Sequence, residues 1–318
     1  MNKRECEYKV KTLVIYPNTN GFYRFIGKGL KMKDVEVDGF YSNFACVFMN
    51  LQRFLSIFNS SLPKRLIIGE WKKKKAETII LFEEVASKDT IKLLDQNNPN
   101  SRKIYYIWNT NVNCEKVEYA RRNGWEIWSF DKNECERKKY LYINQFYPMK
   151  DIVSEQKKWD VFFCGYDKGR AESIKKLIKV FKQDELSFKI IIREWGIKQY
   201  IKAIKSLNRS LVTIFEIDYK KVIQYIEKSR CILDIVKEGQ TGYTMRVMEA
   251  LFYEKKLITN NIRILDADFY KESNFFILGY DDLNALKKWM QIPFDKVGIE
   301  KFKNEYSVEN WYKNLNVL

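Results

Sequence analysis

The chain has 318 residues, which suggests one large domain or two of ordinary size. Apolar residues make up 46% of the chain and charged residues 31%, and this composition excludes disorder of the whole chain. The chain contains no histidine, which excludes Ser-His-Asp and Cys-His catalysis, histidine-containing zinc sites and any histidine general base. Any catalysis must therefore use carboxylates, Lys, Arg, Tyr, Cys, backbone amides or the substrate itself.

The chain is strongly basic. Its 57 Lys and Arg residues and 41 Asp and Glu residues give a formal net charge of +16, of which residues 1–150 carry +10. A basic protein favours a polyanionic partner, such as nucleic acid, an anionic membrane surface or a pyrophosphate-bearing substrate. The densest run is Lys72–Lys75, which we interpret as a solvated loop or helix start, with a membrane-surface patch as the main alternative.

The six cysteines are scattered along the chain and form no CxxC pair, which is typical of free thiols in a reducing compartment. The first residues, MNKRECEYKVK, lack the apolar stretch of a signal peptide. We therefore expect a cytoplasmic location, with peripheral attachment to the inner face of the cell membrane as an alternative.

Short β-rich runs alternate with helical runs along the first half of the chain. The predicted strands are Lys11–Tyr16, Arg65–Ile68, Thr78–Phe82, Lys103–Trp108 and Glu126–Phe130. Helices are predicted over residues 44–58 and 114–123, and residues 17–29 (PNTNGFYRFIGKG) are predicted to form a loop after the first strand. This alternation is typical of a mostly parallel, doubly wound sheet.

The pattern breaks at residues 144–158, which we interpret as a linker, and then restarts. Further strands are predicted at Trp159–Cys164, Phe188–Ile192, Leu211–Phe215, Cys231–Val236, Lys256–Thr259 and Phe275–Leu278. Helices are predicted between them and over Ser307–Leu318. Two such α/β units in tandem can bind a ligand at the carboxyl ends of their strands.

The most informative segment runs from Asp234 to Leu251, DIVKEGQTGYTMRVMEAL. A strand ends near Val236, a loop with two glycines follows, and a helix opens at about Tyr243. The start of a helix favours anions, and glycine lets the backbone approach a ligand closely. Arg246 and Glu249 share one face of this helix, so Arg246 could neutralise a phosphate while Glu249 accepts hydrogen bonds from ribose. An ordinary turn with an exposed Arg–Glu pair is the alternative.

A second loop, Cys164–Arg170, also follows a strand and opens a helix. Lys168 and Arg170 stand at that helix start, where cations are unfavourable unless an anionic ligand is present. Together with Arg246, they could hold a diphosphate without a metal ion. A solvated basic turn is the alternative interpretation.

These residues carry a resemblance to a known family. GQTGYTMRVMEALFYEKKLITNN (239–261), FFCGYDKGR (162–170) and SVENWYKNL (307–315) resemble segments of GT-B-fold glycosyltransferases of bacterial surface-polysaccharide and lipopolysaccharide biosynthesis. The resemblance is weaker in the first half, where it rests on TIILFEE, RKIYYIWN and EIWSFD.

The resemblance implies a fold of two Rossmann-like domains that face each other across a cleft. It implies an acceptor domain over residues 1–150, a nucleotide-sugar domain over 151–295, and a C-terminal helix over 296–318 that packs back on the first domain. It also implies a metal-independent transferase with no cofactor, a UDP-linked donor, and a lipid-linked, lipopolysaccharide or capsule glycan as acceptor. No nucleic-acid partner is expected.

The resemblance also assigns donor-binding residues. They are Gly165, Lys168, Gly169, Arg170, Gln240, Thr241, Gly242, Thr244, Arg246 and Glu249. Glu249 matches the glutamate that holds the donor ribose. Retaining members often carry another glutamate at the position of Thr241, so the stereochemistry of transfer stays open.

An inverting transferase needs a base for the acceptor hydroxyl, and without histidine only carboxylates are plausible. Glu83, Glu84 and Asp131 each follow a predicted strand of the first half, although each could be a surface carboxylate. Asn18, Asn20 and Arg24 in the loop after the first strand are candidate acceptor contacts. Asp266-Ala-Asp268 matches the two-carboxylate metal motif of another glycosyltransferase fold, but the signal is short and we predict no metal site.

Two other function classes stay open. A non-catalytic basic protein that binds nucleotides or nucleic acid is compatible with the charge and the 49 aromatic residues. An epimerase with an NAD site is less compatible, because no GxGxxG follows the first strand.

Overall fold

The computed structural model describes residues 9–42, 68–109, 113–148, 156–194, 196–236 and 242–317. The helix predicted over residues 44–58, most of the strand predicted at 65–68, and the candidate residues Gln240 and Thr241 lie outside this part of the chain. The described residues form two compact units. The first comprises residues 1–148 with 308–318, and the second comprises 149–307.

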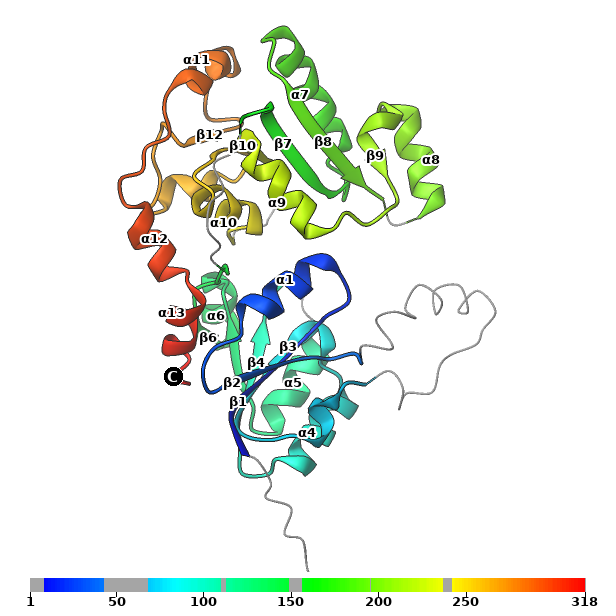
Figure 1. Cartoon of the computed structure of the whole chain (residues 1–318), viewed down its shortest axis with the longest axis vertical. Helices are drawn as coiled ribbons and strands as arrows, with labels where there is room; N and C mark the ends of the chain where they lie inside the picture. The colour runs from blue at the N-terminus through cyan, green and yellow to red at the C-terminus, as the bar shows by residue number, and fades with distance from the viewer. Residues whose placement is uncertain are drawn as a thin grey trace, which may run out of the picture. The chain divides into compact units, whose positions relative to one another are not determined.

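The first unit contains a six-stranded sheet in the order β2-β1-β3-β4-β5-β6, in which all neighbouring strands run parallel. The strands are β1 (Lys9–Tyr16), β2 (Val35–Gly39), β3 (Lys75–Phe82), β4 (Arg102–Ile107), β5 (Glu126–Ser129) and β6 (Leu141–Tyr142). The helices are α1 (Gly21–Gly29), α4 (Lys88–Asn97), α5 (Cys114–Arg122), α6 (Lys132–Lys138) and α13 (Val308–Asn314). Figure 1 shows the helices around this sheet.

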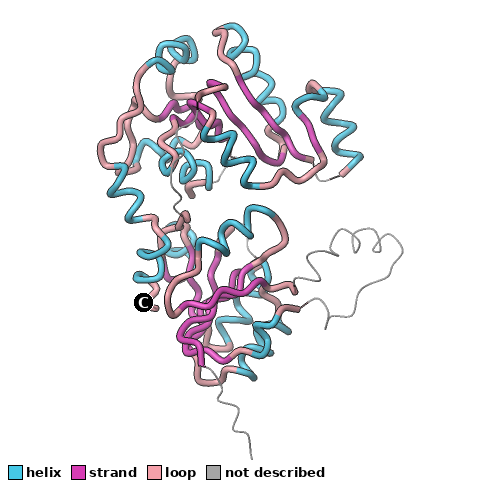
Figure 2. The backbone as a smooth tube through the Cα atoms, viewed as in Figure 1, coloured by secondary structure: helices cyan, strands magenta, loops and turns pink. Residues whose placement is uncertain are grey.

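The second unit contains a six-stranded parallel sheet in the order β12-β11-β10-β7-β8-β9. The strands are β7 (Trp159–Tyr166), β8 (Phe188–Arg193), β9 (Val212–Thr213), β10 (Ser229–Asp234), β11 (Lys256–Thr259) and β12 (Phe275–Ile277). The helices are α7 (Ala171–Gln183), α8 (Ile197–Ser206), α9 (Tyr219–Glu227), α10 (Met245–Phe252), α11 (Leu286–Gln291) and α12 (Ile299–Glu305). Figure 2 shows the strands and helices alternating along the chain of this unit.

The strands have the apolar composition that a buried parallel sheet requires. In β1, Leu13, Val14 and Ile15 are completely buried, and so are Ile79 and Ile80 in β3. Strands that are covered by helices on both faces read as continuous apolar runs, because neither face meets water. The prediction of two doubly wound α/β units is confirmed.

The segment after β1 differs from the prediction, because residues 21–29 form the helix α1 rather than a loop. Asn20 starts this helix, and its side chain accepts a hydrogen bond from the Tyr23 amide at 2.9 Å. Phe25 and Ile26 are buried, so the helix packs one apolar face onto the unit. The helix is short and contains three glycines, so the helical spacing of its apolar residues was not recognised in the sequence.

The C-terminal segment divides between the two units. Phe302 of α12 packs edge-on against Phe252 and Phe269, with ring centroids 5.9 and 5.0 Å away, and so belongs to the second unit. Tyr312 of α13 donates a hydrogen bond to the Leu30 carbonyl at 2.8 Å and belongs to the first unit. The return to the first unit therefore begins at residue 308, later than the expected residue 296.

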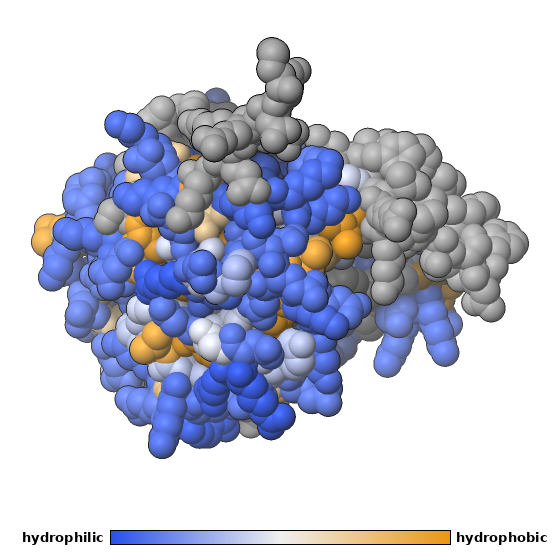
Figure 3. Space-filling model, turned by 90° about the horizontal axis from the view of Figure 1, so that it is seen from below, coloured by the Kyte–Doolittle hydropathy of each residue, from blue (hydrophilic) through white to orange (hydrophobic). Residues whose placement is uncertain are grey.

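None of the helices in the described part of the chain is both long enough and apolar enough to cross a bilayer. The face of the molecule seen in Figure 3 is largely hydrophilic, and its apolar residues form small separate groups.

Candidate functional site

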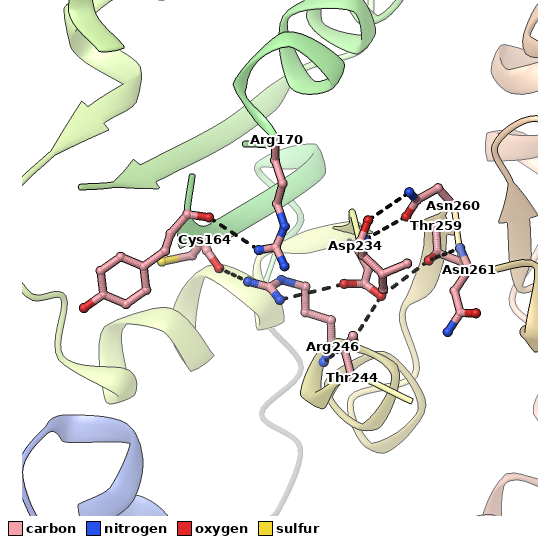
Figure 4. Close-up of polar contacts among 10 residues, drawn as sticks. Cys164, Arg170, Asp234, Thr244, Arg246, Thr259, Asn260 and Asn261 are labelled. Atoms are coloured by element: carbon pink, nitrogen blue, oxygen red, sulfur yellow. Dashed lines mark hydrogen bonds and ion pairs between the residues drawn. The ribbon is translucent and has the colours of Figure 1, made fainter. Parts of the chain in front are cut away.

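The second unit brings polar residues together at the carboxyl ends of β7, β10 and β11. Asp234 is the last residue of β10 and its side chain is completely buried. Its Oδ2 accepts hydrogen bonds from Thr244 Oγ1 at 3.0 Å and from Thr259 Oγ1 at 3.4 Å (Figure 4). Carboxyl ends of parallel strands meet at one edge of a sheet, where α/β proteins bind ligands. Burial raises the pKa of Asp234, although the neighbouring Arg246 opposes this shift.

Arg246 crosses from α10 to the end of β7. Its Nη2 donates a hydrogen bond to the Cys164 carbonyl at 2.6 Å, and its Nη1 lies 3.8 Å from Asp234 Oδ1. A Cβ atom at Gly165 would lie only 2.3 Å from Nη2, so glycine is needed there to let the guanidinium pass. The sequence predicted that Arg246 lies near a pyrophosphate, but the structure also gives it two protein acceptors. It therefore helps to build the site whether or not it contacts a ligand.

Arg170 lies beside Arg246, and fewer of its hydrogen-bond donors have partners. Its Nη1 donates to the Tyr166 carbonyl at 3.4 Å, while its Nε is buried and has no partner in the described part of the chain. Burial and the positive charge of Arg246 both lower the pKa of Arg170. Figure 4 shows the two guanidinium groups pointing toward each other. Arg246 is the one of the two that lies within ion-pair distance of buried Asp234, so Arg170 keeps an unused donor beside a second guanidinium group, and this arrangement favours an anionic ligand.

The loop between β7 and α7 also has the geometry of a tight helix entry. Lys168 is exposed and has a positive φ of 46°, and Gly169 follows with a φ of 85°. The start of α7 is capped by Asp167, whose Oδ1 accepts the Ala171 amide at 2.6 Å. The predicted conflict between cations and the helix start is thus reduced by this aspartate, which the sequence analysis did not assign.

The start of α10 is capped by Thr244, whose Oγ1 accepts the Arg246 amide at 3.2 Å while it donates to Asp234. Gly242, a predicted donor contact, lies three residues before α10, and the description of the chain resumes there after residue 236. Thr244 therefore both caps α10 and, together with Thr259, helps to fix the position of the Asp234 carboxylate.

Glu249 is 7% exposed and accepts a hydrogen bond from Tyr219 Oη at 2.6 Å. Burial raises the pKa of Glu249 to about 7, while Arg246 and Tyr219 oppose the shift. The sequence predicted this carboxylate as a ribose contact, and the structure adds Tyr219 of α9 as the residue that positions it. No local signal in the sequence connects two residues that are thirty positions apart.

Two asparagines after β11 complete this end of the sheet, and the sequence analysis did not assign them. Asn260 pairs with the backbone of Val236, accepting its amide at 2.7 Å and donating to its carbonyl at 3.1 Å. Asn261 is 2% exposed, and its Nδ2 has no partner in the described part of the chain. The pair of asparagines directly after a buried strand was the signal that could have revealed them.

The first unit contains a separate cluster of carboxylates at the carboxyl end of β3. Glu83 Oε2 accepts the Trp108 amide at 2.8 Å, and Glu83 Oε1 accepts Asn109 Nδ2 at 2.9 Å. Glu84 Oε1 accepts hydrogen bonds from Tyr23 Oη at 2.6 Å and from Asn109, while its Oε2 is buried without a partner in the described part of the chain. The structure therefore brings together two of the three predicted base candidates.

The two carboxyl groups have different environments. Burial, followed by the charge of Glu84, raises the pKa of Glu83 to about 9, so Glu83 holds a proton at neutral pH. Burial and Glu84 also raise the pKa of Tyr23, which keeps its hydroxyl protonated as a donor. Two close carboxyls cannot both ionise easily, and such pairs share a proton. The cluster therefore places a protonated carboxyl, Glu83, directly beside a second one, Glu84.

The other candidates in the first unit have structural roles. Asp131 caps α6 by accepting the Glu134 amide at 3.0 Å. Asn18 bridges the Tyr41 backbone, with hydrogen bonds of 2.9 and 3.0 Å. Asn20 caps α1, and Arg24 is exposed on that helix. Asparagine and aspartate are common at such positions because their short side chains satisfy free backbone amides.

The run Lys72–Lys75 is largely neutralised. Lys73 pairs with Glu70 at 2.9 Å, Lys74 pairs with Asp38 at 2.8 Å and with Glu36, and Lys75 donates to the Asn97 carbonyl. Residues 70–73 form a single 3₁₀ turn and Lys75 begins β3, so the run combines a short helical turn with the start of a strand. Asp266 lies 3.7 Å from Arg263 in an exposed ion pair, and no cluster of metal-ligating side chains occurs within the described ranges.

Of the comparisons with known proteins, the one with solved structures supports the fold. No protein-family model matches the sequence, and no curated protein matches it. Among solved structures, Anabaena HepE in complex with UDP-glucose has a TM-score of 0.59 at 11% identity, with 97% of this chain and 100% of that chain covered. Sucrose-phosphate synthase from Thermosynechococcus elongatus has a TM-score of 0.57 at 12% identity, with 97% and 98% covered. AviGT4, a glycosyltransferase of avilamycin A biosynthesis, has a TM-score of 0.56 at 8% identity, with 96% of each chain covered.

This likeness extends over nearly the whole chain, and it is supported by two six-stranded parallel sheets in succession. The chain therefore has the GT-B fold.

Proposed function

We propose that this protein is a glycosyltransferase that transfers a sugar from a nucleotide-sugar donor, with the donor bound in the second unit. The observation that carries the proposal is the pair of adjacent guanidinium groups of Arg170 and Arg246 near the carboxyl ends of β7 and β10, with Arg246 beside buried Asp234 and Arg170 Nε unsatisfied. The fold supports it, since structures with this fold were solved with UDP-glucose and with UDP. A UDP-linked sugar is the donor that we propose.

The leaving diphosphate gains negative charge as its bond to the sugar breaks. Fixed cations and amides aimed at that charge lower the barrier without reorganising. Arg170 is suited to this role because it already carries an unsatisfied donor, whereas Arg246 is held by Cys164 and Asp234. These groups could neutralise the diphosphate without a metal ion, so we propose a metal-independent reaction.

Glu84 is our candidate for the base that takes the proton of the acceptor hydroxyl. Its Oε1 is fixed by Tyr23 and Asn109, while Oε2 is unused by the protein, and Glu83 beside it remains protonated at neutral pH. A general base must lie within hydrogen-bond reach of the proton that it takes, and Glu84 is the carboxylate of this cluster that keeps an unused oxygen. Asp131 is a weaker candidate because it caps a helix.

We propose a glycan of the surface-polysaccharide, lipopolysaccharide or capsule type, or its lipid-linked precursor, as the acceptor. The sequence resemblance of residues 239–261 and 162–170 supports this class. A location at the inner face of the cell membrane would bring the protein to such acceptors.

The proposal is tested by thermal unfolding with UDP, ADP, GDP, CDP and the matching nucleotide-sugars. We expect one nucleotide class to raise the unfolding temperature, and we expect Arg170→Ala to abolish this rise. Arg263→Ala is the matched control, since it removes an arginine from the same unit that forms an exposed ion pair with Asp266. The control should respond to the nucleotide like the wild type.

Turnover is measured by release of the nucleoside diphosphate from the donor that gives the largest shift. Glu84→Gln should reduce release in the presence of acceptor sugars while the nucleotide-induced shift is kept. If no nucleotide changes the unfolding temperature, the transferase proposal is wrong. Binding of nucleotides or oligonucleotides without turnover of any donor would favour the non-catalytic alternative.

A further inference from the structure

One edge of the second unit carries exposed apolar side chains beside uncompensated positive charge. Ile197 and Ile201 of α8 are 67% and 46% exposed, and Phe215, after β9, is 75% exposed. Single exposed apolar residues are normal on a protein surface, but a group of them indicates a site of interaction. We call these residues, together with Lys198, Lys202 and Lys205, the α8 surface.

The three apolar side chains come from segments that follow two neighbouring strands at one edge of the sheet. Ile197 and Ile201 lie one turn apart on the same helix. Arg193 of β8 is paired with Thr213 of β9, and the Glu194 amide donates to the Thr213 carbonyl at 2.9 Å. The ends of β8 and β9 are therefore adjacent. The chain continues from β8 into α8 and from β9 to Phe215. Figure 1 shows α8 next to β9 at the end of the sheet.

Another face of α8 packs on the core of the second unit and holds the helix in place. Ala203 and Leu207 are 6% and 7% exposed and belong to the core of the second unit, with Tyr200 and Ile204 packed against it. Ile197 and Ile201 follow on the side of the helix next to this face, so the core does not require them. Their exposure is a feature that folding alone leaves unexplained.

The charge along α8 has one sign, whereas exposed Glu216, next to Phe215, lies 3.8 Å from Arg193. Residues 196–213 contain three lysines and Arg209 and no acidic residue. Lys198, Lys202 and Lys205 are exposed, and none of them has an ion-pair partner within the described ranges. The helical periodicity of α8 places these three lysines on the face next to Ile197 and Ile201. The contrast with Lys72–Lys75 is clear, because most of that run is engaged by carboxylates and a carbonyl.

We propose that the α8 surface docks on an anionic phospholipid bilayer, with Ile197, Ile201 and Phe215 entering the headgroup region and the lysines contacting lipid phosphates. A helix with aliphatic residues beside lysines is suited to the membrane interface, where apolar burial and attraction to anionic lipids add together. Nucleic acid fits this surface less well, because its binding sites combine cations with aromatic side chains that stack on bases, and two of the three apolar residues here are isoleucines.

The test is co-sedimentation of the full chain with phosphatidylcholine vesicles that contain or lack one quarter phosphatidylglycerol. We expect binding only to the anionic vesicles, and we expect it to weaken as salt rises. Lys198→Gln/Lys202→Gln/Lys205→Gln and Ile197→Gln/Ile201→Gln should each reduce partitioning at least about tenfold. All five positions are exposed, and thermal unfolding checks that the variants remain folded.

Two control variants isolate the surface. Lys175→Gln/Lys176→Gln/Lys179→Gln removes three exposed lysines from α7 in the same unit, and Ile262→Gln/Ile292→Gln replaces two isoleucines that are 51% and 43% exposed. Both controls should bind vesicles like the wild type. If the α7 and α8 lysine variants lose vesicle binding equally, the binding depends on net charge alone and the proposal is overturned.

Absence of binding to anionic vesicles also overturns the proposal. If the α8 variants lose affinity for an oligonucleotide while vesicles do not bind, the surface belongs to nucleic acid instead. No sugar donor is present in these measurements, so their failure leaves the transferase proposal untouched, and loss of transferase activity would leave the membrane proposal untouched.

Discussion

The position of Gly165 gives a sharp prediction about the proposed donor site. A Cβ atom there would lie 2.3 Å from Arg246 Nη2, far inside any allowed contact. The guanidinium can move, since it is the end of a flexible side chain, but it then loses its bond to the Cys164 carbonyl and its proximity to buried Asp234. A hydrogen bond from a charged group contributes about 1.5–3 kcal/mol, so Gly165→Ala should cost about 2–3 kcal/mol.

The assay is a double-mutant cycle measured by thermal unfolding. For a unit of this size, the predicted cost lowers the unfolding temperature by about 4–12 °C. In an Arg246→Met background the guanidinium is absent, so Gly165→Ala should cost close to nothing. If Gly165→Ala costs the same in both backgrounds, the close approach of Arg246 is not the reason for the glycine. A wild-type background that tolerates Gly165→Ala would refute the reasoning equally.

Three further predictions concern the first unit. Because burial raises the pKa of Glu83 from 4.5 to about 9, its stabilising effect is full below about pH 4.5 and is lost as pH rises toward 9. Glu83→Gln should therefore gain stability relative to the wild type as pH rises, and unfolding curves from about pH 5 to 9 would contradict this if the difference stayed constant. Tyr312→Phe removes a hydrogen bond to the Leu30 carbonyl at a buried site and should cost about 1–2 kcal/mol in denaturant unfolding, with the exposed Tyr280→Phe as a neutral control. Asn20→Ala removes the cap of α1 and should cost about 1 kcal/mol, whereas Arg24→Ala on the same helix should leave stability unchanged.

The alternation of strands and helices in both halves follows from the amino-acid sequence alone. Runs such as TLVIY and TIILF are apolar without interruption, which is the composition of a strand buried on both faces. The helix at residues 171–183 was visible from the spacing of Ile174, Leu177 and Phe181. The absence of histidine likewise limits the chemistry through composition alone. These features are local, so propensity and periodicity suffice to read them.

The use of the candidate residues depends instead on contacts between distant segments. Arg170 comes from the loop before α7 and Arg246 from α10, and Asp234 and Tyr219 became part of the candidate site through the order of strands in the sheet. Likewise, Glu83 and Glu84 acquired their environment from Tyr23, on a helix sixty residues away that the sequence presented as a loop. Hydrogen bonds and burial depend on which segments meet in space, and a local pattern of residues carries little information about that.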